Sequence, residues 1–218
     1  MAVTLTAPSE TLRLLRFDAV QRAAHWANAV LFGILMTTAI PLYFGNFFGI
    51  YLPRHVLNLT HLWTGLTLPI PIVISLLGPW GTAMRRDFLR FSYWTRDEIR
   101  WLRTFGRSPL RADKFNPGQK LNALLIGAAI VIMLATGAIL QWFRFFPVSW
   151  RQGATFVHDL GTIGVFLLVA GHIIMAVTHR DSLRSIFRGW VSARWASVHA
   201  PGWWNERPPV SDASPRRD

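Results

Sequence analysis

The sequence predicts an all-α membrane protein: a four-helix transmembrane bundle with interfacial amphipathic helices and both termini in the cytoplasm. Hydrophobic residues make up 51% of the 218 residues and charged residues only 16%. The mean hydropathy is positive, and the apolar residues gather in long runs. Lys and Arg flank these runs, which is the distribution that membrane topology produces.

Four runs are near the ~20 residues that a helix needs to cross a bilayer. They cover residues 24–44, 57–79, 121–142 and 154–178. Pro69 and Pro71 should kink the second span, because each removes a backbone donor. The first run is long enough to stay in the membrane, so we expect no cleavable signal. We expect a single domain over residues 1–206, followed by a disordered polar tail, residues 207–218.

The distribution of Lys and Arg predicts the orientation. The N-terminal arm holds three of these residues, the 80–120 segment ten and the tail from Arg180 seven, whereas segments 45–56 and 143–153 hold one and two. Both termini and the 80–120 segment should therefore face the cytoplasm. The net charge of +12 is then explained by topology and anionic lipid, and not by a nucleic-acid partner.

Segments 84–110 and 181–204 mix arginine with aromatic residues, so they should form helices lying on the membrane surface. A solvated, lipid-facing amphipathic helix is the simpler interpretation of both, and docking onto a partner subunit is the alternative. The chain has no cysteine. This excludes disulfides, cysteine-ligated iron–sulfur clusters, thiol catalysis and covalent haem attachment in this chain.

The fourth span carries two histidines, His158 and His172, although imidazole is costly in hydrocarbon without a partner. An interval of fourteen residues is close to four helical turns, so both lie on one face, about 21 Å apart along the axis. With the predicted topology, His25 in the first span is level with His172. His61 in the second span is level with His158.

Two layers of paired imidazoles from different helices are what two haems need, with each iron held by two histidines. Gly65, Gly161 and Gly171 lie close to these histidines in sequence and would let a flat macrocycle approach a helix. A transition-metal or proton-relay site in a transporter is an alternative explanation of the same pattern.

The remaining histidines fit other positions. His55 is a competitor of His61, but it lies beside Arg54 in the outer loop. His179 and His199 fit the membrane surface and the amphipathic tail. Asp159 is either a solvated residue near the helix end or a hydrogen-bond partner in the outer layer.

These motifs resemble the gamma, cytochrome b subunit of membrane-bound formate dehydrogenases, over roughly residues 13–206. The stretch RFDAVQRAAHW resembles the family's entry to the first span, LTHLWTG its second ligand motif, and FVHDLGT and AGHIIM its two ligand positions on the fourth helix. KFNPGQKLNALL resembles the Lys-aromatic-Asn-x-Gly-Gln-Lys signature that opens the third span. GWVSARWASVHAPGWW resembles the family's C-terminal tail.

The resemblance implies a diheme cytochrome b with two non-covalent b-type haems. His25 and His172 would ligate the haem near the cytoplasm. His61 and His158 would ligate the outer haem.

The resemblance also implies a quinone site at the cytoplasmic face, formed partly by Asn116, Gly118 and Gln119. Asn and Gln can donate hydrogen bonds to a quinone carbonyl, and glycine lets a ligand approach the backbone. Pro117 occupies the variable position and removes one possible main-chain contact. From the residues alone, a helix start capped by Asn116 is the favoured explanation of this stretch, and it is the resemblance that favours the quinone site.

The resemblance implies an electron-transfer subunit of a formate:quinone oxidoreductase, multi-pass in the bacterial inner membrane. A molybdenum or tungsten alpha subunit would oxidise formate, and an iron–sulfur beta subunit would pass electrons through the two haems to quinone. Membrane lipid is an expected partner and nucleic acid is not. The alternatives are the cytochrome b subunit of another respiratory molybdoenzyme or hydrogenase, and a haem-free transition-metal transporter.

Overall fold

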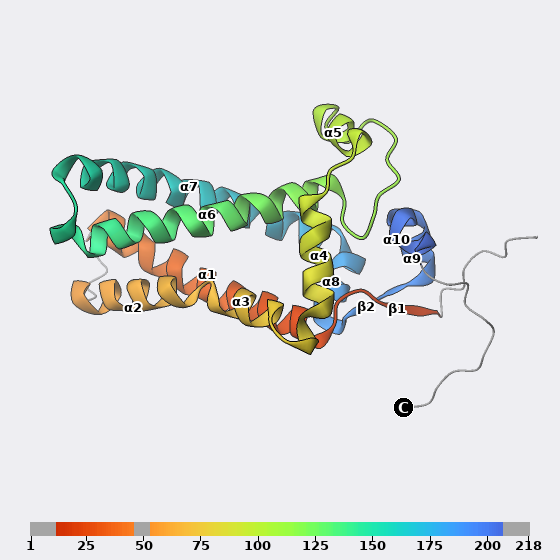
Figure 1. Cartoon of the computed structure of the whole chain (residues 1–218), viewed down its shortest axis with the longest axis horizontal. Coiled ribbons are helices and arrows are strands. Elements are labelled where there is room, and N and C mark those ends of the chain that lie inside the picture. The colour runs from red at the N-terminus through yellow and green to blue at the C-terminus, as the bar shows by residue number, and fades with distance from the viewer. Residues whose placement is uncertain (1–11, 46–52, 207–218) are drawn as a thin grey trace, which may run out of the picture.

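The computed structural model describes residues 12–45 and 53–206, so the predicted tail lies outside the described residues. Long helices run side by side along one axis, and most of the shorter elements gather at one end of them (Figure 1). The first half of the chain contains β1 (Arg13–Leu15), α1 (Ala19–Phe44), α2 (Arg54–Thr67), α3 (Ile70–Leu76), the 3-10 turn η2 (Pro79–Gly81), α4 (Thr82–Ser92) and α5 (Arg96–Arg103). The second half contains α6 (Pro117–Gln141), the 3-10 turn η3 (Phe143–Phe145), α7 (Val148–Thr178), α8 (Arg180–Arg188), β2 (Trp190–Ser192), α9 (Ala193–His199) and α10 (Pro201–Asn205).

Four helical segments are long and apolar enough to cross a membrane: α1, α2 with α3, α6 and α7. The four predicted spans are confirmed, but all four helices start before their apolar runs. Capping explains two of these early starts. Asp18 and Asn116 each accept a hydrogen bond from a backbone N–H in the first turn of α1 and α6, and each forms a capping box with a glutamine three residues later.

The second span is interrupted between Thr67 and Ile70, where a kink was predicted. Pro69 and Pro71 cannot donate backbone hydrogen bonds to the preceding turn. Leu68 N instead donates to Thr64 O at 3.0 Å and to Gly65 O at 3.2 Å, which closes α2 before the first proline.

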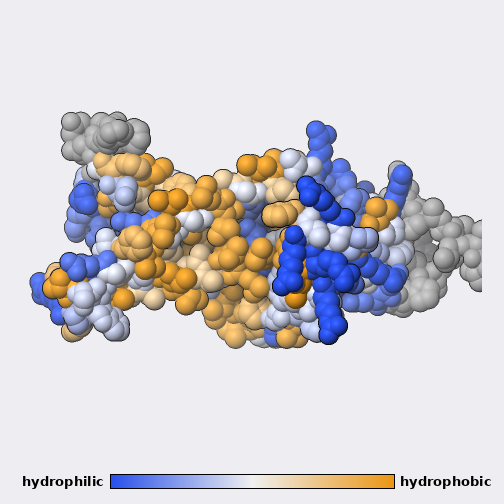
Figure 2. All heavy atoms as spheres, turned by 90° about the horizontal axis from the view of Figure 1, so that it is seen from above, coloured by the Kyte–Doolittle hydropathy of each residue, from blue (hydrophilic) through white to orange (hydrophobic). Residues whose placement is uncertain are grey.

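The middle of the molecule has an apolar surface between two polar ends (Figure 2). Large apolar side chains on all four spans are exposed, among them Val30, Val73, Val131 and Leu167. A continuous apolar surface of this kind is not stable in water, whereas hydrocarbon solvates it at no cost. The chain is therefore a multi-pass membrane protein.

The bundle consists of two antiparallel helix pairs. α1 packs along α2 and α3, and α6 packs along α7, whereas contacts between the two pairs are sparse. Figure 1 shows the pairs lying one above the other along the long axis. Side chains that point between the pairs are therefore the ones that can hold a group inside the bundle.

A small antiparallel sheet joins the N-terminal arm to the tail, and the sequence did not predict it. Leu14 of β1 pairs with Val191 of β2, and both are buried in a cluster with Ala193, Ala196 and Trp203. The 181–204 segment is thus α8, β2, α9 and α10, so a strand separates the expected helices. Its first helix ends at Gly189, which has φ +86° and where a Cβ would collide with the Arg22 side chain.

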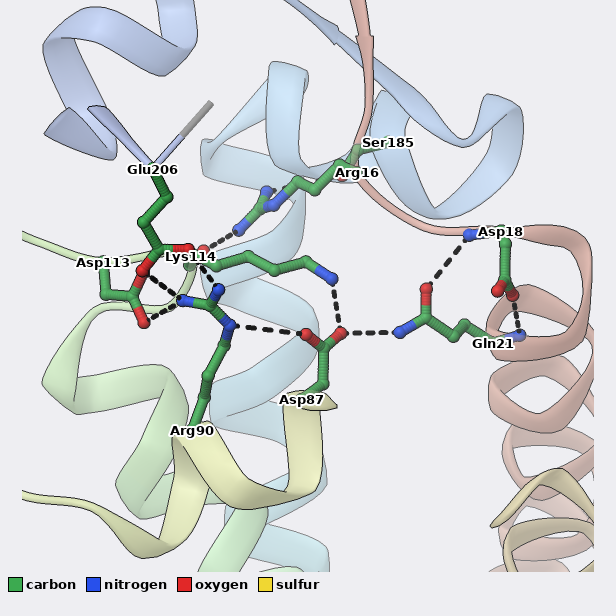
Figure 3. A network of polar contacts seen from close by, with 9 residues as sticks. All are labelled: Arg16, Asp18, Gln21, Asp87, Arg90, Asp113, Lys114, Ser185 and Glu206. Atoms are coloured by element: carbon green, nitrogen blue, oxygen red, sulfur yellow. Dashed lines mark hydrogen bonds and ion pairs between the residues drawn. The ribbon is translucent and has the colours of Figure 1, made fainter. Parts of the chain in front are cut away.

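A buried polar network connects the short elements (Figure 3). Asp87 on α4 accepts hydrogen bonds from Lys114 Nζ and, at 2.6 Å, from Gln21 Nε2 in the first turn of α1. Arg90, one turn after Asp87, donates to Asp113 and to Glu206 just beyond α10. Burial raises the pKa of Asp87, and the positive charge of Lys114 opposes that rise. Asp87 therefore fastens α4 to α1 and to the segment before α6.

Arg16 extends this network to the tail. Its guanidinium donates to Lys114 O at 3.0 Å and to the hydroxyls of Ser182 and Ser185 on α8, each at 3.4 Å. Burial lowers the pKa of Arg16 to about 10, an effect that the Asp87 carboxylate opposes, so the side chain stays charged at neutral pH. The Arg16 side chain thus connects the N-terminal arm to α8 and to the segment before α6.

A second buried ion pair fastens α5 to α6. Lys120 Nζ lies 2.6 Å from Glu98 Oε1, and the two side chains are 3% and 6% exposed. Glu98 also accepts the backbone N–H of Thr95, which caps α5. The segment between Lys114 and Lys120 is therefore held at both ends, each lysine binding a carboxylate on a different short helix.

Lys120→Met should destabilise the protein by about 3–5 kcal/mol, because it leaves the Glu98 charge buried without a partner. Thermal unfolding of the detergent-solubilised protein measures this effect. The exposed Arg100–Asp97 pair on α5, the helix that carries Glu98, supplies the control. Arg100→Met should change stability by less than about 1 kcal/mol. Equal effects of the two substitutions would contradict a stabilising role of the buried pair.

Candidate functional site

Four of the seven histidines form two pairs that connect the two helix pairs. His25 on α1 faces His172 on α7 with 6.1 Å between ring centroids. His61 on α2 faces His158 on α7 with 6.4 Å between ring centroids. We call the His25–His172 pair the basic-end layer, because it lies toward the end that carries α4, α5 and α8–α10, and the His61–His158 pair the far layer.

Both separations fit an iron ion bound between two imidazoles. A metal–imidazole bond is about 2 Å long and the ring centre lies about 1 Å beyond the bonding nitrogen, so two rings on opposite sides of one iron have centroids roughly 6 Å apart. The donor set also fits a haem, since two axial imidazoles complete an iron whose other ligands come from a porphyrin. Within residues 12–45 and 53–206, no group of three or more His, Asp or Glu side chains could hold a bare metal ion.

The second ring nitrogen of each histidine has a different environment in the two layers. In the far layer, His61 Nδ1 lies 2.9 Å from Thr38 Oγ1 on α1, and His158 Nδ1 lies 2.9 Å from Thr136 Oγ1 on α6. In the basic-end layer, His172 Nδ1 lies 3.5 Å from the Asn122 amide. His25 Nδ1 is buried and has no hydrogen-bond partner in the part of the chain that the structure describes.

Sequence reasoning missed Thr38, Asn122 and Thr136, although a signal for two of them was present. Asn122 and Thr136 on α6 are separated by fourteen residues, the same interval that separates the two histidines of α7. Because α6 and α7 are antiparallel neighbours, equal intervals place each polar residue level with one histidine.

The structure places the other candidate residues outside the two layers. His55 lies in the first turn of α2 and faces no other histidine ring within the described ranges. His179 Nδ1 lies 2.8 Å from Met175 O, and His199 stacks on Trp195 with 5.3 Å between ring centroids. Asp159 is not the hydrogen-bond partner of His158, because Thr136 takes that position.

The three glycines expected to admit a macrocycle differ in their surroundings. A Cβ on Gly171 would meet nothing within 4 Å, and one on Gly65 would make an ordinary contact with Leu35. A Cβ on Gly161 would lie 2.7 Å from Met133 Sδ on α6. The expectation for Gly161 is therefore corrected: it lets α7 approach α6, and it does not open space between the helix pairs.

The signature segment begins α6 at the basic end. Asn116 Oδ1 accepts the Gln119 backbone N–H at 2.9 Å, and Gln119 Oε1 accepts the Asn116 backbone N–H at 3.1 Å. The segment is thus a capped helix start, as the residues alone predicted, and the cap occupies the side-chain amide oxygens of both Asn116 and Gln119. No described residue accepts a hydrogen bond from either side-chain NH₂ group, so both remain available as donors.

The signature segment lies close to the basic-end layer. Asn122, which contacts His172, is six residues after Asn116 in the same helix, about 9 Å along the axis. A Cβ on Gly118 would lie 3.3 Å from Asn116 Oδ1 and 3.9 Å from the Trp101 ring. Gly118 therefore keeps the capping amide of Asn116 free of crowding.

Comparison with known proteins agrees with this arrangement. A family model described as "Prokaryotic cytochrome b561" matches residues 16–189. A relative from Haemophilus influenzae, named "Formate dehydrogenase, cytochrome b556 subunit", is 28% identical, with 91% of this chain and 85% of the relative covered.

Two relatives from Escherichia coli strain K12 match over similar lengths. The "Formate dehydrogenase, nitrate-inducible, cytochrome b556(Fdn) subunit" is 25% identical over 91% of this chain and 93% of its own length. The "Formate dehydrogenase, cytochrome b556(fdo) subunit" is 23% identical over 88% of this chain and 92% of its own length. The resemblance predicted from the histidine and signature motifs is thereby confirmed.

Asn116→Ala should destabilise the protein by about 1 kcal/mol, because it removes the acceptor that caps α6. Asn116→Asp should not, since aspartate is an equally good cap and its negative charge is favourable at a helix N-terminus. Thermal unfolding in detergent measures both. An aspartate variant as unstable as the alanine variant would show that the cap is not what Asn116 contributes to stability.

Proposed function

Because the chain belongs to the prokaryotic cytochrome b561 family, a family of b-haem proteins, we propose that it is the membrane-anchoring cytochrome b subunit of a formate dehydrogenase complex. In this role it would hold two b haems and a quinone site. The observation that carries the proposal is the pair of histidine layers, each with two rings about 6 Å apart and each joining the two helix pairs.

His25 and His172 would hold one haem, and His61 and His158 the other. Bound at these layers, the haems would supply reversible one-electron transfer between the far end and the basic end of the bundle. The contribution of the chain is positional, because α7 supplies one ligand to each layer and sets the distance between them. Helix α1 supplies His25, and α2 supplies His61, so each layer is completed from the opposite helix pair.

The signature segment would form the quinone site with Asn116, Gly118 and Gln119. The capping bonds orient both amides, so their free NH₂ groups can donate to a quinone carbonyl. Lys114 and Lys120 hold the segment from both sides through Asp87 and Glu98. A quinone bound there would lie beside the basic-end layer.

The orientation predicted from Lys and Arg places this end in the cytoplasm of a bacterial inner membrane. Quinone reduction would then draw its protons from the cytoplasm, and electrons would enter at the opposite face. The names of the relatives support a formate-oxidising partner. We propose that this partner consists of a molybdenum or tungsten catalytic subunit and of an iron–sulfur subunit, which would supply the clusters that this chain, having no cysteine, cannot bind through thiolates.

The purified protein should contain two non-covalent b haems per chain in a low-spin, six-coordinate state. Haem extraction and counting, with a reduced-minus-oxidised visible spectrum, tests this directly. His61→Ala and His158→Ala should each remove the same haem, while His55→Ala should retain both. A folded, haem-free wild-type protein would overturn the proposal. Loss of a haem from the His55 variant would show that His55, and not His61, is the far-layer ligand.

Asn116→Asp and Gln119→Glu should slow reduction of the haems by an added quinol at least about tenfold if each lost donor is worth about 1.4 kcal/mol. Both variants keep the capping oxygen and replace the NH₂ donor with a carboxylate oxygen, which cannot donate. Stopped-flow spectroscopy of the purified protein measures the rate, and the haem content, which should be unchanged, is the internal control. Wild-type quinol kinetics in both variants would exclude these amides from the quinone site.

A further inference from the structure

We infer that Thr38 and Thr136 are positioning residues for the far layer, each fixing the ring proton and the orientation of one histidine. The inference rests on the proposed function, since it concerns the histidines proposed to hold one of the two haems.

The two threonines occupy matched places in the two helix pairs. Thr38 lies on α1 and contacts His61 on the adjacent α2, while Thr136 lies on α6 and contacts His158 on the adjacent α7. Both contacts are 2.9 Å long, and both threonines are 8% exposed. Most other residues of these spans are far more exposed, so two buried hydroxyls beside two facing imidazoles point to a shared role.

The hydrogen bonds of each hydroxyl determine which nitrogen of the histidine carries the proton. Thr38 Oγ1 lies 2.8 Å from Ile34 O, and Thr136 Oγ1 lies 2.8 Å from Ile132 O. A carbonyl oxygen can only accept, so each hydroxyl donates its one proton to the helix backbone. Toward the imidazole the hydroxyl oxygen is then an acceptor, and Nδ1 must be the donor.

A histidine protonated at Nδ1 presents an unprotonated Nε2, which is the form that binds a metal ion. The same hydrogen bond holds the plane of the ring and increases the electron density that the imidazole donates. Greater donation favours ferric over ferrous iron, so both threonines should lower the reduction potential of the far-layer haem.

The basic-end layer has no matched pair of this kind. His25 Nδ1 has no partner among the described residues, and the Asn122 contact with His172 is 3.5 Å long, at the limit of a hydrogen bond. The reduction potential of the far-layer haem should therefore be lower than it would be with the hydrogen bonding of the basic-end layer. Such a difference would favour electron flow toward the proposed quinone site.

Thr38→Val and Thr136→Val should each raise the potential of one haem, and that haem should be the same in both variants. A tenfold loss of preference for ferric iron corresponds to a rise of about 59 mV. The readout is a potentiometric titration of the purified protein, followed by visible spectroscopy, with the haem content measured alongside. No partner subunit or catalytic turnover is needed.

Three variants serve as controls. Thr38→Ser and Thr136→Ser keep the hydroxyl and should retain wild-type potentials. Thr37→Val removes the neighbouring hydroxyl of α1, which is exposed and donates to Gly33 O without contacting a histidine. It should leave both potentials unchanged.

The outcomes separate this inference from the proposed function. A valine variant that loses only one haem, while the serine variant keeps both, supports the positioning role as much as a shifted potential does. Unchanged potentials in both valine variants, shifts on two different haems, or equal loss of both haems in the valine and serine variants would overturn it. A wild-type protein without two haems would overturn the proposed function itself.

Discussion

Helix α7 sets the distance on which the rest of the arrangement depends. It runs without interruption from Val148 to Thr178, so its two inward histidines are held on one face at a separation fixed by the helical rise, about 21 Å. The histidines of the opposite helix pair match that spacing. α1 and α2 run antiparallel to each other, so that His25 reaches one layer and His61 the other. A proline in α7 like those that break the second span would destroy the match between layers.

The long helices have little to hold them together in the interior, because contacts between the two pairs are sparse. Much of the order at the basic end comes instead from buried charge. Asp87 and Glu98 are carboxylates on two short helices, and each is neutralised by a lysine that flanks the start of α6. Charges this deeply buried are tolerated only when paired. The signature segment is therefore fixed by its neighbours before any ligand binds, which is the preorganisation that a binding site requires.

The two histidine layers are alike in ring separation and different in hydrogen bonding. The far layer has a threonine on each histidine, whereas the basic-end layer has a buried unpaired nitrogen and one long contact. This difference would suit the proposed electron transfer toward the basic end, because hydrogen bonds to a ligand are among the few means by which a chain tunes a haem potential. It also leaves the polar atoms of the basic-end layer free at the end where the proposed quinone site lies.

The sequence by itself determined the four spans, the break at Pro69 and the equal levels of the histidines. These features depend on local quantities: the length of an apolar run, the missing N–H of proline and the number of residues per turn. Tertiary structure decided which polar residues support the histidines. Thr38 looks like an ordinary span residue until α2 brings an imidazole to it, and the fourteen-residue interval between Asn122 and Thr136 gains its meaning only once α6 lies beside α7. Tertiary structure also decided the β1–β2 pairing and the role of Gly161, because strand pairing and helix contact join residues far apart in the chain. The double role of Asn116 lies between these cases: its cap is a local pattern, but the proximity of its free amide to the basic-end layer follows only from the position of α6 beside α7.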